Sequence, residues 1–362
     1  MPKEIIISLD AMGGDHGPSV VAGGVESYLE NNPDADVRFV LHGDEAALRE
    51  ELKRLARARR ICQIVHTERV VAMDEKPAQA VRRGKGTSLW SAIEMVRDGK
   101  ADAVVSAGNT GALMAMSKLI LRMSAPGLER PAIVASWPTL RGITAVLDVG
   151  ANVSSDAEQL VEFAIMGEAF HRAVHGVERP SIGLLNIGSE DIKGNEAVRE
   201  AASLLRTGGF DLDYQGFVEG DDIAKGTVDV IVTDGFTGNI ALKTAEGTAR
   251  FISSLMKEAL TSGVRSRVGA AIAMPALRQI RARIDPNAIN GGPLLGLNGV
   301  VVKSHGGASA YGFGNAIRVA VDLARSDYTR KVTANLERLG RVMDGASAAA
   351  QAHTQHAEES RV

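Results

Sequence analysis

A short segment near the start of the chain combines acidic, basic and very small residues in an arrangement suited to anion binding. It follows the β-branched run 5–7 and precedes residues 19–30, which have a helical pattern. Glycine lets backbone N–H groups approach a ligand closely, and a helix N-terminus favours negative charge. The segment therefore predicts a phosphate-binding turn; the alternative is a tight turn that needs glycine only for its shape. It reads Ser8-Leu9-Asp10-Ala11-Met12-Gly13-Gly14-Asp15-His16-Gly17-Pro18.

Glycine-bearing loops directly follow other predicted strands, at 107–111, 148–152, 188–194, 233–239 and 304–307. In a parallel sheet, ligands bind beyond the carboxyl ends of the strands. We therefore expect the polar side chains of these loops to converge at one edge. They are Asp10, Asp15, His16, Asn109, Asp148, Asn152, Lys193, Asp234, Asn239 and His305.

These residues include no obvious covalent nucleophile, which favours a reaction in which a bound anion is itself the nucleophile. Phosphate suits that role, because it needs positioning and charge neutralisation more than deprotonation. Lys193, ahead of a predicted helix start, is the best candidate to hold an oxyanion; the alternative is a solvated loop lysine. Asn109 and Asn239 are candidate oxyanion donors or plain N-caps. His16 and His305 are candidate acids or bases, or histidines packed in turns.

Several common sites are not supported by the sequence. The nearest fragment to a Walker motif is 84–87, where Gln79 occupies the first glycine position, and no complete G-x-G-x-x-G occurs. The nucleophile-elbow motif G-x-S-x-G is incomplete at 307–311, because tyrosine stands where the motif has its last glycine. The aspartates lack the spacing of a dedicated Mg²⁺ motif, so no metal site is predicted.

Two other groups of residues are given structural interpretations. His171 and His175 lie four apart, but Arg172 stands where a zinc protease has glutamate, so a solvated helix face is expected. Cys62 is the only cysteine of the chain and lies in the apolar run 61–65, which favours a buried, inert thiol over a nucleophile.

Composition excludes several functional classes. The 362 residues carry 41 Lys and Arg against 44 Asp and Glu, a net charge of -3, and only 4% aromatic residues, so nothing points to nucleic acid. No signal peptide and no uninterrupted run of 18 apolar residues is seen, and a soluble, cytoplasmic protein is the expectation.

Strand-like and helix-like patterns alternate along the chain, which predicts an α/β fold with a mostly parallel sheet and helices on both faces. Residues 1–343 are expected to form one α/β domain, including a helical hairpin at 240–285, and 344–362 a disordered tail. The expected strands are 5–7, 37–43, 61–67, 103–106, 132–137, 143–149, 181–187, 212–218, 228–232 and 299–303. The expected helices are 19–30, 44–58, 87–97, 112–123, 156–174, 195–206, 240–260 and one beginning near 315.

Six motifs at consistent spacing resemble the bacterial phosphate acyltransferases of the PlsX type, and the resemblance runs from about residue 4 to about residue 335. The motifs are 10–15, 106–112, 147–152, 185–188 with 193–194, 233–239 and His305-Gly306. The resemblance implies transfer of a long acyl chain from acyl carrier protein to inorganic phosphate, giving acyl phosphate for phospholipid synthesis. It also implies a three-layer αβα Rossmann-like fold similar to phosphotransacetylases and isocitrate-dehydrogenase-like proteins, and no cofactor.

The same resemblance implies roles for individual residues and for partners. Lys193 and Asn239 would be the strongest catalytic candidates, and His16, a candidate acid or base from its residue type, joins them as a catalytic candidate. The substrate and phosphate pocket would be lined by Asp10, Gly13, Gly14, Asp15, Asn109, Thr110, Gly111, Asp148, Asn152, Asp234 and His305. The protein is expected to be a cytoplasmic homodimer associated with the membrane surface, where a glycerol-phosphate acyltransferase uses the product.

A basic amphipathic stretch at 263–284, broken by Pro275, contains five arginines and no acidic residue. It suits an anionic membrane or the acidic surface of acyl carrier protein. The alternative is dimer packing with solvated arginines. The candidate contact residues are Arg265, Arg267, Leu277, Arg278, Ile280 and Arg281.

Three other functions stay open on the sequence alone: a short-chain phosphotransacetylase that uses coenzyme A, a non-catalytic regulator that binds phosphate or nucleotide, and a nicotinamide-dependent dehydrogenase. The missing dinucleotide fingerprint weighs against the last.

Overall fold

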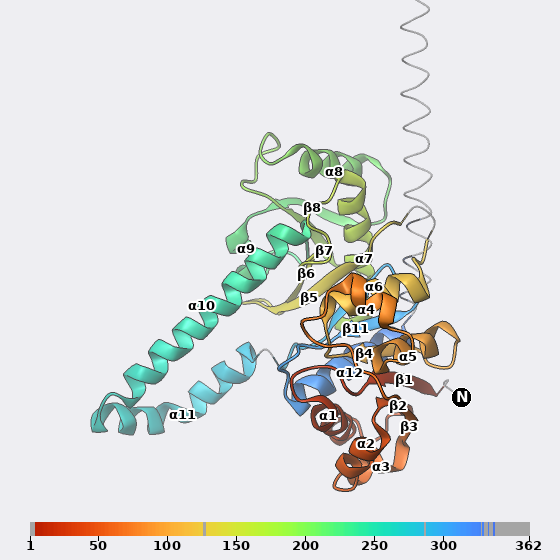
Figure 1. The fold of residues 1–362 in the computed structure, drawn as a ribbon. Coiled ribbons are helices and arrows are strands. Elements are labelled where there is room, and N and C mark those ends of the chain that lie inside the picture. Colours follow the sequence, from red (N-terminus) through yellow and green to blue (C-terminus); the bar gives the residue numbers. More distant parts are fainter. Residues whose placement is uncertain are drawn as a thin grey trace, which may run out of the picture.

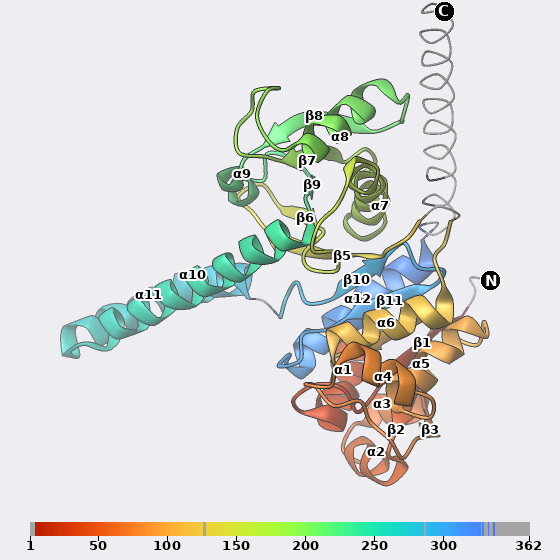
Figure 2. The ribbon, with the colours of Figure 1, turned by 45° about the horizontal axis from the view of Figure 1, so that its top comes forward.

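The computed structural model describes residues 4–125, 128–285 and 287–326 with Tyr328, Val332 and Leu336; the side chains of 279–284 are not described. Within these residues, one eleven-stranded sheet has the order β3-β2-β1-β4-β11-β10-β5-β6-β9-β7-β8, and its strands can be followed in Figures 1 and 2 together. The strands are β1 (Ile5–Asp10), β2 (Val37–Gly43), β3 (Cys62–His66), β4 (Ala103–Ser106), β5 (Ala132–Pro138), β6 (Ile143–Leu147), β7 (Ser181–Leu185), β8 (Asp213–Val218), β9 (Val230–Val232), β10 (Gly292–Leu295) and β11 (Val300–Lys303).

The sheet consists of two parallel halves joined by antiparallel strands. Strands β3, β2, β1, β4 and β11 run parallel, and so do β6, β9, β7 and β8. Between them, β10 is antiparallel to both β11 and β5, and β5 is antiparallel to β6. These three reversals leave the halves running in opposite directions along the sheet. The mostly parallel sheet is confirmed, but the expectation of one common carboxyl edge is wrong, because that expectation did not include β10 or the antiparallel β5–β6 pair.

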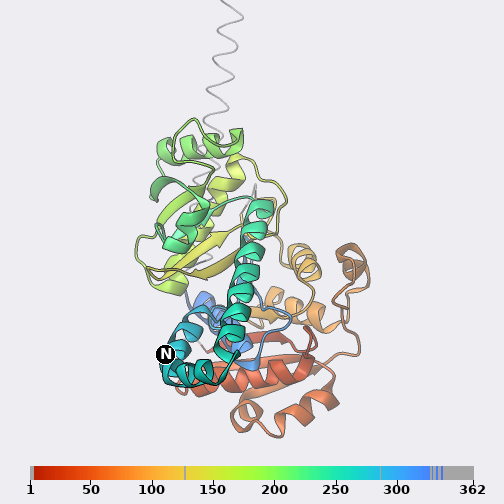
Figure 3. The ribbon, with the colours of Figure 1, turned by 90° about the vertical axis from the view of Figure 1, so that its left-hand side faces the viewer.

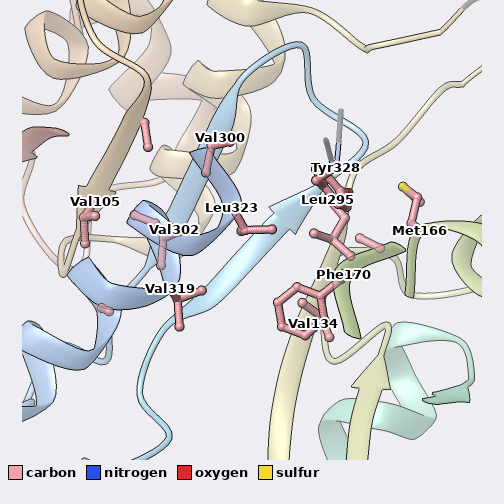
Figure 4. Packing of buried hydrophobic residues seen from close by; sticks show 14 of the residues in the cluster. Val105, Val134, Met166, Phe170, Leu295, Val300, Val302, Val319, Leu323 and Tyr328 are labelled. Carbon is pink, nitrogen blue, oxygen red and sulfur yellow. The ribbon is translucent and has the colours of Figure 1, made fainter. Parts of the chain in front are cut away.

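Helices cover both faces of the sheet, as expected for a three-layer fold. Neighbouring residues of one strand serve opposite faces, since Val105 packs with α1 (Gly17–Asn31) and α12 (Ala310–Arg325), whereas Val104 packs with α5 (Ser88–Arg97) and α6 (Thr110–Leu121). The core continues across the join between the halves. In Figure 4, valines 302 and 134, from β11 and β5, lie in one cluster with Phe170 of α7 (Ala157–His175).

Some element boundaries differ from the sequence expectation. The helix expected at 44–58 is split into α2 (Glu45–Leu52) and α3 (Ala56–Ile61), because Leu55 between them has an extended backbone. Helix α12 begins at Ala310, five residues earlier than expected, and is capped by Ser309. Helices α4 (Pro77–Arg83), α8 (Glu196–Thr207) and α9 (Gly220–Lys225) complete the covering layers. The expected tail at 344–362 lies outside the described residues.

Helices α10 (Gly235–Thr261) and α11 (Val264–Ile284) form a hairpin that extends away from the body of the protein (Figures 1 and 2). This confirms the hairpin expected from the sequence, and Figure 3 shows α10 from the side, crossing in front of both halves. Among the described residues of α10, only Gly235 and Gly238 in its first turn are buried. The rest of α10 exposes apolar side chains such as Phe251 and Leu255.

The basic stretch forms α11, with Pro275 inside the helix. Arg265, Arg267 and Arg278 are exposed, and Leu277 is half-buried. The side chains of Ile280 and Arg281 lie outside the described ones. The exposed arginines are compatible with the contact role expected for this stretch, which stays a prediction.

Candidate functional site

The first cluster of candidate residues lies at the carboxyl ends of three adjacent strands. Asp10 of β1 pairs in register with Ser106 of β4, which pairs with Lys303 of β11, so the three lie side by side. The hydroxyl of Ser106 donates to Asp10 Oδ2 over 2.7 Å. Burial raises the pKa of Asp10, against the hydrogen bonds from Ser88 and Ser106. We name Asp10, Ser106, Lys303 and the turns that follow them the β1/β4/β11 cluster.

Glycines let these three turns pack directly on one another. A Cβ atom on Gly13 would lie 2.6 Å from the backbone nitrogen of Gly108 and 2.7 Å from Asp10 Oδ2. Gly14 has a φ of 92° and packs between Ala107 and Gly306, and the backbone N–H of Asp15 donates to Gly306 O at 3.0 Å. A larger residue at Gly13 would force the turns apart.

Helices α1, α6 and α12 all start at these turns, directly after β1, β4 and β11. Their N-terminal N–H groups and dipoles therefore point toward one region at this edge of the sheet. Asp15, His16 and His305 are exposed there. The arrangement is suited to a multiply charged anion that approaches from solvent.

The carboxamide of Asn109 is occupied by the protein itself. Its oxygen accepts from Ala112 N at 3.0 Å and so caps α6, while its nitrogen donates to the backbone oxygens of Met73 and Glu75 at 2.9 and 2.8 Å. The N-cap interpretation left open by the sequence is thus confirmed. Thr110 and Gly111 are the first residues of α6, and Gly111 lies against Pro77.

The two histidines of this cluster differ in their surroundings. His305 Nδ1 accepts from Gly307 N at 3.2 Å, and the backbone N–H of His305 donates to Asn290 Oδ1. This arrangement places the proton of a neutral ring on Nε2. His16 precedes α1, and its side chain does not cap that helix.

Lys303 is a functional candidate that sequence reasoning missed. Its ammonium group donates to the backbone oxygens of Ala107, at 3.1 Å, and Ser304. Burial lowers its pKa to about 8, although Asp10 and Asp15 act in the opposite direction. The available signal was a lysine closing the apolar run 300–302 immediately before a glycine-bearing loop.

A second cluster lies at the ends of β6, β9 and β7, and its acidic residue organises the backbone. Asp148 is fully buried: Oδ1 accepts from the backbone of Ile133, Gly150 and Ala151, and Oδ2 from the backbone and side chain of Asn152. Burial raises the pKa of Asp148 and these bonds oppose the shift. The loop 148–152 is thus folded around one carboxylate.

The start of α10 packs against that loop. Asp234 caps the helix by accepting from Thr237 N and Oγ1 at 2.8 and 3.0 Å. A Cβ atom on Gly238 would overlap the backbone oxygen of Asp148, so only glycine fits there. Asn239 is exposed and lies against Gly150, where a Cβ atom would be 3.5 Å from its Cγ.

Lys193 occupies the loop after β7. Its backbone N–H donates to Glu190 O at 2.9 Å, its side-chain stem lies over Gly188, and it is exposed. Among the described residues its ammonium group has no hydrogen bond or ion pair. We name the loops 148–152, 186–194 and 233–239 the β6/β9/β7 cluster.

The structure thus groups the predicted site residues into two clusters at the ends of oppositely directed halves. No hydrogen bond or ion pair between described residues joins one cluster to the other. No group of three or more His, Cys, Asp or Glu side chains in the described part of the chain is arranged to hold a metal ion.

The expected solvated face at His171 and His175 is wrong. His171 is buried, and its Nε2 donates to Ile143 O at 3.1 Å; His175 Nε2 lies 3.1 Å from Ser136 Oγ. Both line a cavity of about 260 Å³, and burial lowers the pKa of His175 to about 4. The face is covered because α7 packs on the sheet. At Cys62, burial raises the thiol pKa to about 12, which favours the inert thiol.

Comparisons with known proteins show the family of this chain. Residues 5–331 match the model of a family described as "Fatty acid synthesis protein". A protein of Caulobacter vibrioides named phosphate acyltransferase is 63% identical over 339 residues, covering 94% of this chain and 93% of its own. One of Phenylobacterium zucineum with the same name is 58% identical, covering 94% and 95%. The chain belongs to the phosphate acyltransferase family. Members of this family are enzymes, and the resemblance seen in the sequence motifs is confirmed.

Solved structures support the fold. The EutD phosphotransacetylase from Staphylococcus aureus has a TM-score of 0.58 at 16% identity, covering 89% of this chain and 95% of its own. A phosphotransacetylase from Streptococcus pyogenes has the same TM-score at 18% identity, covering 89% and 94%. At these identities the likeness concerns the fold alone. The helices described here include none long and apolar enough to cross a membrane.

Proposed function

We propose that this enzyme transfers a long-chain fatty acyl group from acyl carrier protein to inorganic phosphate. Family membership supports acyl transfer to phosphate. The observation that carries the proposal for this chain is the β1/β4/β11 cluster, where three helix N-termini and close-packed glycine turns meet beside Lys303. Such a site suits a dianion that must be held without being covalently activated.

In the proposed reaction, a phosphate oxygen attacks the thioester carbonyl carbon. The C–S bond of the resulting tetrahedral intermediate breaks, the thiolate takes up a proton, and the products are acyl phosphate and free carrier thiol. Lys193 and Asn239 are the candidate donors to the oxyanion, because both are exposed and lie in neighbouring loops. The reaction requires the two clusters to meet at the bound thioester, since the attacking phosphate oxygen and the oxyanion share one carbon atom. His16, exposed at the phosphate cluster, is the candidate proton donor to the thiolate, with His305 as an alternative.

A long acyl chain is favoured by apolar side chains in the β6/β9/β7 cluster. Loops 186–194 and 233–239, the residue that follows loop 148–152, and the first turns of α10 expose such residues to solvent, at 50% to 82% of their full area. An acyl chain that covers them removes that apolar surface from water. These residues are Val153, Ile187, Ile192, Phe236 and Ile240.

The α10–α11 hairpin is the proposed surface for the protein and membrane partners. Its exposed apolar residues and arginines suit a second copy of the chain, an anionic membrane surface and the acidic carrier protein. We place the enzyme at the cytoplasmic membrane surface, where a glycerol-phosphate acyltransferase consumes the acyl phosphate in phospholipid synthesis.

The test is release of carrier thiol from purified long-chain acyl carrier protein, with and without phosphate. We expect phosphate-dependent release by the wild type and a large loss in Lys193→Ala. Equal, phosphate-independent rates for the two proteins would contradict the proposal.

A short-chain phosphotransacetylase that uses coenzyme A is the second candidate, because solved phosphotransacetylases share the fold. Acetyl-CoA, tested beside long-chain acyl carrier protein under the same conditions, separates the two. A non-catalytic regulator would instead bind phosphate tightly and turn over neither donor.

A further inference from the structure

Lys303 occupies a central position among the turns of the β1/β4/β11 cluster. The register Asp10–Ser106–Lys303 places it two strand spacings from Asp10, about 10 Å between Cα atoms. Its side chain is partly buried and reaches toward the neighbouring strand end, where Nζ donates to Ala107 O. A second donation goes to Ser304 O, the first residue of the next turn. The ammonium group therefore ties the turn after β4 to the turn after β11.

Those two turns form much of the proposed phosphate site. Ala107 and Gly306 both contact Gly14, and Gly306 O accepts from Asp15 N. A change in the spacing between Ala107 and Ser304 would therefore displace the turn after β1 as well. Since backbone N–H groups at all three turns are the expected phosphate donors, their spacing determines how well the anion is held.

The positive charge of Lys303 also affects the electrostatics of the proposed phosphate site. Asp10 and Asp15 are the acidic groups that face it, from β1 and from the turn after β1, and both raise its pKa. Their carboxylates lie at the same strand ends where phosphate would bind, and two negative charges repel a dianion. A lysine in the same cluster offsets that repulsion.

We propose that Lys303 is a positioning residue of the phosphate subsite, which fixes the spacing of the turns after β4 and β11 and offsets Asp10 and Asp15. This inference rests on the proposed function and names the residue on which phosphate affinity depends. It predicts an effect on phosphate and little effect on the acyl donor, whose proposed contacts lie in the β6/β9/β7 cluster.

The experiment compares Michaelis constants in Lys303→Met, which keeps the length of the side chain and removes its charge. We expect the KM for phosphate to rise tenfold or more, while the KM for acyl carrier protein stays within about twofold. Lys118→Met, an exposed lysine on α6, is the matched control and should leave both constants unchanged. Equal changes in both constants of Lys303→Met, or an unchanged KM for phosphate, would overturn the proposal.

A measurement on the wild type covers the case in which Lys303→Met does not fold. Because the pKa of Lys303 lies at about 8, its charge is lost between about pH 7.5 and 9, where inorganic phosphate is already mostly a dianion. The KM for phosphate should rise five- to tenfold over this range; a flat profile overturns the proposal. A wild type without phosphate-dependent turnover would instead refute the proposed function, so the two failures are distinguishable.

Discussion

The two clusters share one local plan, a strand, a glycine-bearing loop and a helix, but they use it differently. In the β1/β4/β11 cluster, Ser106 separates the acidic side chain of Asp10 from the partly buried Lys303, and three helix N-termini lie at the same strand ends. In the β6/β9/β7 cluster the carboxylate of Asp148 accepts hydrogen bonds from five backbone and side-chain donors, and Lys193 is exposed. We propose that the first cluster holds an anion. In the second, the Asp148 carboxylate holds loop 148–152, against which Asn239 of α10 packs.

The largest expected effect, that of Lys193→Ala, tests whether the two clusters serve different steps, phosphate binding in one and acyl transfer in the other. Lys193→Ala should lower kcat by about 10²- to 10³-fold, the usual loss when one oxyanion donor is removed, and leave the KM for phosphate within about threefold. Steady-state kinetics with both substrates varied measures this. A rise in the KM for phosphate with kcat unchanged would mean that Lys193 binds phosphate. The assignment of phosphate binding to one cluster and oxyanion stabilisation to the other would then be wrong. Lys118→Ala serves as the control.

A second prediction concerns stability. Asp148→Asn should lower the free energy of unfolding by about 2–3 kcal/mol, because an amide nitrogen replaces an acceptor and leaves buried N–H groups unpaired. Asp15→Asn, at an exposed aspartate of the other cluster, should change it by less than about 0.5 kcal/mol. Urea unfolding of both variants provides the comparison, and equal effects would show that Asp148 is not the organising residue.

A third prediction tests the packing of the turns. Gly14→Ala imposes a side chain at a φ of 92°, and its Cβ would lie 2.9 Å from that of Ala107. We expect the KM for phosphate to rise about tenfold, since roughly 1–2 kcal/mol of backbone strain displaces the donors. Gly99→Ala also has positive φ but nothing within 4 Å, and should leave this constant unchanged. The same increase in both variants would attribute the effect to stability rather than to the phosphate site.

The smallest expected effect lies on the hairpin that extends from the second cluster. Leu277→Glu should reduce binding to anionic liposomes several-fold, because it adds a negative charge to a basic apolar surface. Sedimentation with vesicles containing anionic lipid measures it, and kcat with soluble substrates should be unchanged. If sedimentation is unaffected, the stretch contacts carrier protein or a second copy of the chain instead.

Local features of the sequence predicted most elements but not how they combine. Helix α5 lies within one residue of its expected range 87–97, and Asn109 adopts one of the two roles that the sequence left open. The reversal between the halves could not be predicted, because β10 has only four residues and includes a proline and a glycine. Lys303 was missed for a related reason: its importance depends on the register with Ser106 and Asp10, which lie about 200 and 290 residues away in sequence.

Histidine 171 shows the limit of reasoning from one element alone. Arg172, at the position where a zinc protease has glutamate, argued against a zinc site. Which side of α7 faces solvent depends on β5 and β6. The burial of His171 and the partial burial of His175 follow from tertiary packing, which overrides the local pattern. The same limit applies to Asp148, whose donors come partly from Ile133 on a neighbouring strand.

Helix α10 is fixed at one end and long, so a force on its far end is transmitted to the residues near its start. Its first turn is fixed against the loop of Asp148 through Gly235 and Gly238, and the 27 residues of the helix extend about 40 Å from that point. Asn239 lies one turn from the fixed end. A partner that held the far end would act on Asn239 through this length. A rotation of a few degrees about the fixed end moves the tip by several ångströms, whereas the Asn239 side chain shifts by a fraction of one.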